Sequence, residues 1–159
     1  AAPLSGGGAA ARFAVRDLRA YLRGRWRCER SLADRGVAAR FDGVARFSDG
    51  AAGTGTTRLD YKEEGVVTME GGGSSSATRA YTYTFPDGPA VAEVLFEDGR
   101  FFHPLDLQSG EWQATHLCGD DVYEGAFAAL SEDTWTMTWN VKGPRKDQTL
   151  RTRFLRESE

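Results

Sequence analysis

Residues 134–156 read TWTMTWNVKGPRKDQTLRTRFLR, and the alternation in this stretch decides the fold class. From Trp135 to Val141, large apolar side chains occupy every second position, and threonines or Asn140 stand between them. A period of two is typical of a β-strand whose two faces meet different surroundings. Turn residues at 143–147 lead into a second alternating run at 148–156. The stretch therefore predicts an antiparallel hairpin in an all-β protein.

Similar runs fill most of the chain before this hairpin. They begin with the strand around Trp26 and continue at residues 40–48, 56–64, 66–70, 78–85, 91–97, 100–103, 111–117 and 122–130. Turn signals separate them, among them the pair Asp98 and Gly99. About ten consecutive short strands predict an antiparallel up-and-down barrel of the calycin or lipocalin type, with a sandwich as the alternative. We expect the strand at 148–156 to pair with the Trp26 strand and close the barrel.

Composition limits the class of protein. The chain has 159 residues, 40% of them hydrophobic and 27% charged, which suits one globular domain. Its net charge of −3 argues against a nucleic-acid binder, and no apolar run is long enough for a transmembrane helix. Cys28 and Cys118 fit no zinc-finger spacing. We expect free thiols and an intracellular protein of the cytoplasm or of an organelle, a chloroplast or mitochondrion if the N-terminus is processed.

The N-terminal part divides into a tail and a helix. Residues 1–10 are mostly Ala, Gly and Ser, so we expect a disordered tail or a processing remnant, with one barrel domain over 11–159. Residues 11–22 have a helical period, and Gly24 should end the helix. A narrow basic stripe follows one face of this helix: Arg12, Arg16, Arg19 and Arg23. It could dock the chain to an acidic partner or a membrane surface, or it could be the solvated face of a helix that plugs one barrel end.

The terminal hairpin leaves two interiors open. If Trp135 and Trp139 point inward, the barrel is packed or holds a hydrophobic ligand. If Arg151 and Arg153 point inward, these charges need an anionic ligand or a buried acid.

The unusual polar residues gather in the last third of the chain. His116 and Cys118 are two positions apart and share one strand face, and Tyr123 begins the next strand. Gly125 leaves room for a bulky neighbour or a ligand beside the backbone. We hypothesise that His116 faces the interior, in one pocket with Tyr123. A metal site built from His103, His116 and Cys118 is an alternative, but no fourth ligand is evident and we expect none. Residues 53–57 lack the ending of a phosphate loop and are discarded.

Several motifs together resemble a little-characterised calycin-like family of small proteins, catalogued as a domain of unknown function. The matching residues are Gly24-Arg25-Trp26, Phe102-His103-Pro104-Leu105, the set His116, Cys118, Asp121, Tyr123 and Gly125, then Trp139, residues 143–147 and Thr152-Arg153-Phe154-Leu155-Arg156. The resemblance covers nearly all of the chain after residue 12. It implies a lipocalin-type or fatty-acid-binding-protein-type barrel and implies no activity.

We therefore expect a barrel that binds a small hydrophobic or mixed ligand. The candidate pocket residues are His103, His116, Cys118 and Tyr123, framed by Trp26, Trp139 and Arg153. Two alternatives stay open. The chain could be a non-catalytic accessory subunit of an organellar or membrane-associated assembly, docked through the basic stripe. It could also be an isomerase or lyase acting on a bound pigment or lipid, with His116 or Tyr123 as acid or base. The residues do not choose between a hydrophobic ligand, haem, a bilin or none.

Overall fold

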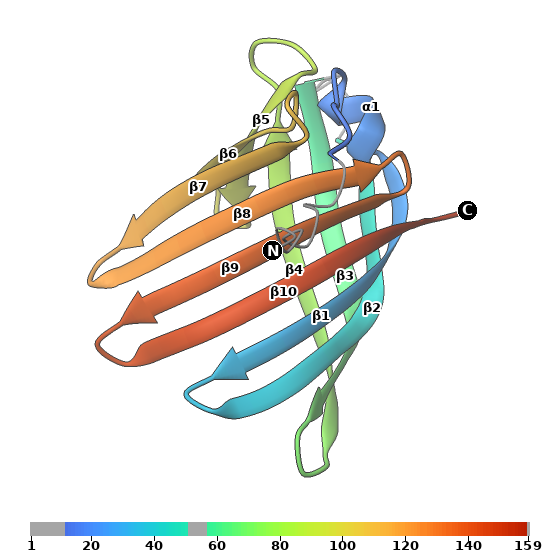
Figure 1. Cartoon of the computed structure of the whole chain (residues 1–159). Coiled ribbons are helices and arrows are strands. Elements are labelled where there is room, and N and C mark those ends of the chain that lie inside the picture. Colours follow the sequence, from blue (N-terminus) through green and yellow to red (C-terminus); the bar gives the residue numbers. More distant parts are fainter. Residues whose placement is uncertain (1–11, 51–56, 159) are drawn as a thin grey trace, which may run out of the picture.

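A computed structural model describes residues 12–50 and 57–158 as one short helix and ten antiparallel strands wound into a nearly closed barrel (Figure 1). The elements are α1 (Leu18–Leu22), β1 (Gly24–Asp34), β2 (Val37–Asp49), β3 (Arg58–Met69), β4 (Ser74–Thr84), β5 (Val91–Phe96), β6 (Phe101–Asp106), β7 (Glu111–Cys118), β8 (Asp121–Ser131), β9 (Thr134–Gly143) and β10 (Lys146–Glu157). No helix among the described residues has the length and apolar character needed to cross a membrane. The expected tail at 1–10 and most of the discarded loop at 53–57 lie outside the described residues.

Consecutive strands pair throughout, with one exception. The strand order is β6-β5-β4-β3-β2-β1-β10-β9-β8-β7, so β1 pairs with β10 and joins the two ends of the meander. Cys28 lies opposite Phe154 in this ladder. The predicted pairing is confirmed, and the sandwich alternative is wrong. The seam of the barrel lies instead between β6 and β7, where no ladder forms and the indole Nε1 of Trp112 donates to the Pro104 carbonyl at 3.0 Å.

Strand β3 runs through the position where we expected a break between two strands. Gly65 pairs with Gly43 of β2, and a Cβ on either glycine would lie 2.8 Å from the ring tip of Phe41 and closer still to backbone atoms of the neighbouring strand. The absence of both side chains leaves room for the ring of Phe41 and for the close approach of the two strands. Gly65, which resembled a strand break, therefore lies within one long strand.

The predicted helix over residues 11–22 is wrong in extent. Residues 12–15 are not helical, because Phe13 N–H donates to the Ala129 carbonyl and Val15 N–H donates to the Leu107 carbonyl, each at 2.9 Å. Asp17 then caps α1 by accepting from the backbone N–H of Ala20 at 2.9 Å. Tertiary backbone pairing thus replaces the first turns of the expected helix.

The short helix closes one end of the barrel. Leu18 and Leu22 are fully buried, and the hydroxyl of Tyr21 donates to the Ser131 carbonyl in the β8–β9 turn at 2.8 Å. Below α1, Trp135 stacks on Phe154 with ring centres 4.1 Å apart. The helix α1 therefore covers one end of the barrel (Figure 1), and its buried leucines belong to the hydrophobic core.

Candidate functional site

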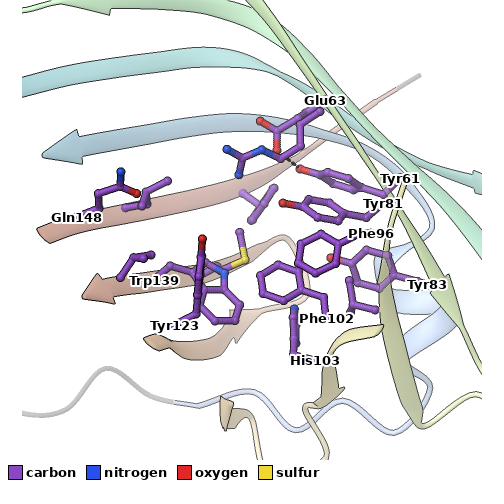
Figure 2. A pocket seen from close by; sticks show the side chains of 16 residues that line it. Tyr61, Glu63, Tyr81, Tyr83, Phe96, Phe102, His103, Tyr123, Trp139 and Gln148 are labelled. Carbon is purple, nitrogen blue, oxygen red and sulfur yellow. Dashed lines mark hydrogen bonds between the residues drawn. The ribbon is translucent and has the colours of Figure 1, made fainter. Parts of the chain in front are cut away.

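A cavity of about 280 Å³ lies inside the barrel, between the β3–β6 wall and the β8–β10 wall (Figure 2). Strand alternation places large side chains of both walls on this inner face. The aromatic residues that line it are Tyr61, Tyr81, Tyr83, Phe96, Phe102, Tyr123, Trp139 and Phe154. The sequence allowed either face of the terminal hairpin to point inward. The apolar face does so: Trp135 and Trp139 are buried, and Arg151 and Arg153 are exposed.

A stack of flat rings forms one side of the cavity. Phe96 lies parallel to Phe102 with ring centres 4.4 Å apart, and Phe102 lies nearly parallel to Trp139 at 4.8 Å. Trp139 can lie there because Gly125 opposite it has no side chain; a Cβ at Gly125 would approach the indole to 2.8 Å. The predicted gap at Gly125 therefore admits Trp139. Both faces of Phe102 are thus covered by its neighbours, and the stack contributes aromatic, apolar surface to the cavity wall.

A buried ion pair supplies polar groups on the β3 side. The guanidinium of Arg30 donates to both carboxylate oxygens of Glu63, at 2.6 and 3.0 Å, and both side chains are about 3% exposed. The Tyr61 hydroxyl donates to the same carboxylate at 2.8 Å, and Arg30 Nε donates to Thr152 at 2.7 Å. Every charge in this network has a partner, which is the condition for burying it.

The network sets the protonation of Glu63. Burial alone would raise the pKa of this carboxyl, but the hydrogen-bonded guanidinium of Arg30, together with Arg79 and the Tyr61 hydroxyl, more than offsets burial. The net effect lowers the pKa of Glu63 below its usual value, so the carboxylate is ionised at neutral pH. Burial raises the pKa of Tyr61 and Tyr81, which keeps both phenols protonated as hydrogen-bond donors.

His103 lies on the cavity wall and is only 2% exposed. Its Nδ1 is 2.7 Å from the Pro104 carbonyl, and a neutral ring donates there. Burial lowers the pKa of His103 to about 4, so the imidazole is neutral at physiological pH. With Nδ1 donating, Nε2 is an acceptor, and no partner for it exists among the described residues.

The structure brings some of the expected pocket residues together and separates others. His103, Tyr123 and Trp139 line the cavity. His116 is half-buried opposite Tyr123 in the β7–β8 ladder, with its ring 5.3 Å from Phe102 and 5.7 Å from Tyr123. It therefore lies beside the cavity without lining it. Whether any of these side chains contacts a ligand stays a prediction.

Three expected pocket residues lie elsewhere. Cys118 is exposed at the end of β7, and Arg153 is exposed on the outer wall, because its position on β10 has the opposite parity to buried Thr152 and Phe154. Trp26 is fully buried in the core under α1, where its Nε1 donates to the Leu22 carbonyl at 2.8 Å. Cys28 is buried and free, so the expected absence of a Cys28–Cys118 bond holds.

The basic stripe does not form. Arg12 pairs with Glu111 at 3.0 Å, and Arg19 and Arg23 both pair with Asp49, at 2.6 and 3.0 Å. Arg16 is exposed. The stripe required a helix over the whole of 11–22, and only five residues are helical. These arginines therefore fasten the N-terminal segment to the barrel instead of presenting one docking face.

Sequence reasoning missed Arg30, Glu63 and Arg79 as site residues. Arg30 shares a strand face with Trp26 and Cys28, which could have marked it as buried. The carboxylate that neutralises it lies two strands away, and no local pattern reveals that pairing. Within residues 12–50 and 57–158, no three His, Cys, Asp or Glu side chains are grouped closely enough to hold a metal ion.

The fold is that of known calycin-like barrels. The S-type phycobiliprotein lyase CPES from Guillardia theta has a similar structure, with a TM-score of 0.67, 10% sequence identity, and coverage of 93% of this chain and 95% of that one. A protein of unknown function from the DUF3598 family of Nostoc punctiforme matches with a TM-score of 0.59 and 14% identity. That match covers 97% of this chain and 54% of the Nostoc protein. At these identities the likeness concerns the fold alone.

No curated protein matches the sequence. A family model does match, over residues 22–156, which is nearly the whole barrel from the end of α1 to the end of β10. The chain belongs to the DUF6314 family, a family of unknown function.

Proposed function

We propose that this barrel binds a small, flat, largely hydrophobic molecule in its interior. The observation that carries the proposal is the 280 Å³ cavity with aromatic walls, closed by α1 at one end of the barrel. Ligand sites are typically apolar hollows with a few polar groups that fix orientation. Here those groups are the Glu63 carboxylate, the tyrosine hydroxyls and the Nε2 acceptor of His103.

A neutral fluorescent probe tests the proposal. N-Phenyl-1-naphthylamine is small, flat and uncharged, and its emission rises in apolar surroundings. We expect saturable binding to the wild-type protein, with quenching of Trp139. Leu150 lies on the inner face of β10 at the cavity, and its neighbour Arg151 lies on the outer face. Leu150→Trp should block the probe, and Arg151→Trp should not. Equal binding by both variants, or no binding by the wild type, would overturn the proposal.

Catalysis on the bound molecule is a second candidate. It is favoured by His103, whose neutral imidazole stands on the cavity wall. A base with a pKa of about 4 is weak. His103 is therefore better suited to orient a ligand, as a hydrogen-bond acceptor, than to remove a proton from it. The lyase with a similar fold is named for a phycobiliprotein, so a pigment is one ligand class to examine. An absorption spectrum of protein purified from its native source would reveal a bound pigment directly; a colourless protein would count against it.

A further inference from the structure

A second space adjoins the interior cavity of the barrel. This space of about 720 Å³, the outer chamber, lies toward the β1–β2 turn and is half open to solvent; its largely apolar walls include Leu32, Val67 and the exposed Met69. The two spaces share three lining residues, Arg79, Gln148 and Leu150. These three side chains therefore lie at the junction between the two spaces, and a molecule that occupied both would pass beside them.

The charges around this junction do not cancel. Glu63 in the inner cavity is held by Arg30 in a two-point ion pair. Asp34 in the outer chamber pairs with Arg35 at 3.4 Å and accepts from Gln148 at 3.4 Å. Arg79 is exposed and lies opposite Glu63 in the β3–β4 ladder, but it has no carboxylate within 4 Å among the described residues. Its guanidinium therefore reaches solvent where the two spaces meet, without an ion-pair partner of its own.

We propose that the ligand is an amphipathic anion whose carboxylate, or a similar group, binds Arg79 at the junction. Its flat apolar part lies against the rings of Phe102 and Trp139, and the remainder occupies the outer chamber. Arginine suits this role because its planar guanidinium holds an anionic group with two parallel hydrogen bonds. The inference rests on the proposed function, since it specifies the chemistry of the molecule that enters the same cavity.

Two probes that differ by one charged group test the inference. 8-Anilinonaphthalene-1-sulfonate is N-phenyl-1-naphthylamine with a sulfonate added. Binding of the neutral probe therefore measures access to the cavity, and the difference in affinity between the two probes measures the contribution of the anion site. The measured quantity is the dissociation constant of each probe for wild type, Arg79→Gln and Arg79→Lys. Arg153→Gln is the matched control, because it removes an exposed arginine from the outer wall.

We expect Arg79→Gln to weaken sulfonate binding by about tenfold, the worth of one charge-assisted contact. Neutral-probe binding should stay unchanged, which also shows that the variant is folded. Arg79→Lys should recover part of the loss, and Arg153→Gln should cause none. Equal effects of Arg79→Gln on both probes, no effect on either, or an equal loss with Arg153→Gln would overturn the inference. Failure of the neutral probe to bind the wild-type protein would overturn the proposed function itself, and with it the inference about Arg79.

Discussion

Two buried side chains, Arg30 and Glu63, make the interior of this barrel unlike a purely apolar core. They neutralise each other at about 3% exposure, and Tyr61 and Thr152 take up further hydrogen bonds. A buried ion pair adds little net stability compared with well-packed apolar residues. Removal of one partner, however, leaves the other charge buried without compensation and destabilises the fold. Because Glu63 and Tyr61 line the cavity, the position of the ion pair favours a role in holding these two polar side chains in place.

We predict that Glu63→Gln lowers the free energy of unfolding by about 3 kcal/mol, because Arg30 then stays buried without a counter-charge. The double variant Arg30→Met with Glu63→Leu should recover most of this loss. Urea denaturation at pH 7 measures both. A single variant as stable as wild type would mean that water reaches the Arg30 guanidinium.

The imidazole of His103 predicts a dependence of stability on pH. Burial lowers its pKa to about 4 in the folded state, against 6.5 in the unfolded chain. The unfolded state therefore binds more protons between these values. The stabilisation is complete above pH 6.5 and is lost as pH falls toward 4, up to about 3 kcal/mol.

Denaturation curves from pH 7.5 to 4 measure this loss. His103→Gln should flatten the curve over that interval, and His116→Gln should keep it because His103 is intact. A histidine NMR resonance of His103 that titrates near pH 6.5 would contradict the prediction. Glu63 contributes a further loss of stability at lower pH. Its pKa is lower in the folded than in the unfolded state, so its stabilising effect is complete above the unfolded pKa and disappears as pH falls through the folded pKa.

At the scale of elements, the N-terminal segment is a lid that is bonded into the barrel end. Residues 12–15 pair by backbone hydrogen bonds, α1 buries Leu18 and Leu22, and Arg156 donates to the Tyr21 carbonyl at 2.8 Å. Gly110 permits the crossing, since it has a φ of +87° and a Cβ there would lie 2.8 Å from Arg12. The short helix is therefore part of the folded core.

We predict that Leu22→Ala destabilises the protein by about 3 kcal/mol, the usual cost of a cavity at a fully buried leucine. Arg16→Ala, on the exposed side of the same segment, should change stability by less than about 0.5 kcal/mol. Thermal or urea unfolding of both variants checks the pair. A neutral Leu22→Ala would show that α1 does not pack on the barrel.

At the scale of the whole molecule, the barrel is a single curved sheet with one open seam. Strand β1 has a partner on each side, β2 and β10, whereas β6 and β7 face each other without a ladder (Figure 1). The rings of Phe102 and His116 pack across this seam, which borders the cavity wall. The seam is therefore where the backbone is least protected, and it adjoins the proposed site.

We predict an alternating pattern of hydrogen exchange along β7. Amides that pair with β8 should be protected, and those that face β6 should exchange orders of magnitude faster, because they lack a backbone acceptor. Amides of β1 and β10 should exchange slowest of all. NMR-detected exchange measures this residue by residue. Uniform protection along β7 would show that the seam closes in solution.

The sequence by itself determined the strands and their faces. Alternation from Trp135 to Val141 predicted the inward apolar face, because side chains on a strand must alternate and large apolar ones gain most from burial. The unbroken meander predicted the pairing of β1 with β10. Gly125 predicted the close approach that Trp139 makes. The faces of the strands and the gap at Gly125 are local properties, whereas the β1–β10 pairing followed from the order of the strands along the whole chain.

Only the tertiary structure decided what those faces enclose. Arg30 met Glu63 because the register of three strands brought them together across 33 positions of sequence. Arg153 lies outside the pocket because its neighbours Thr152 and Phe154 occupy the inner face of β10, and Cys118 is exposed as the last residue of β7. Residues 12–15 are not helical because the carbonyls of Ala129 and Leu107 offer hydrogen bonds that outweigh helical propensity. Burial, register and long-range pairing are properties of the closed barrel, and no local stretch contains them.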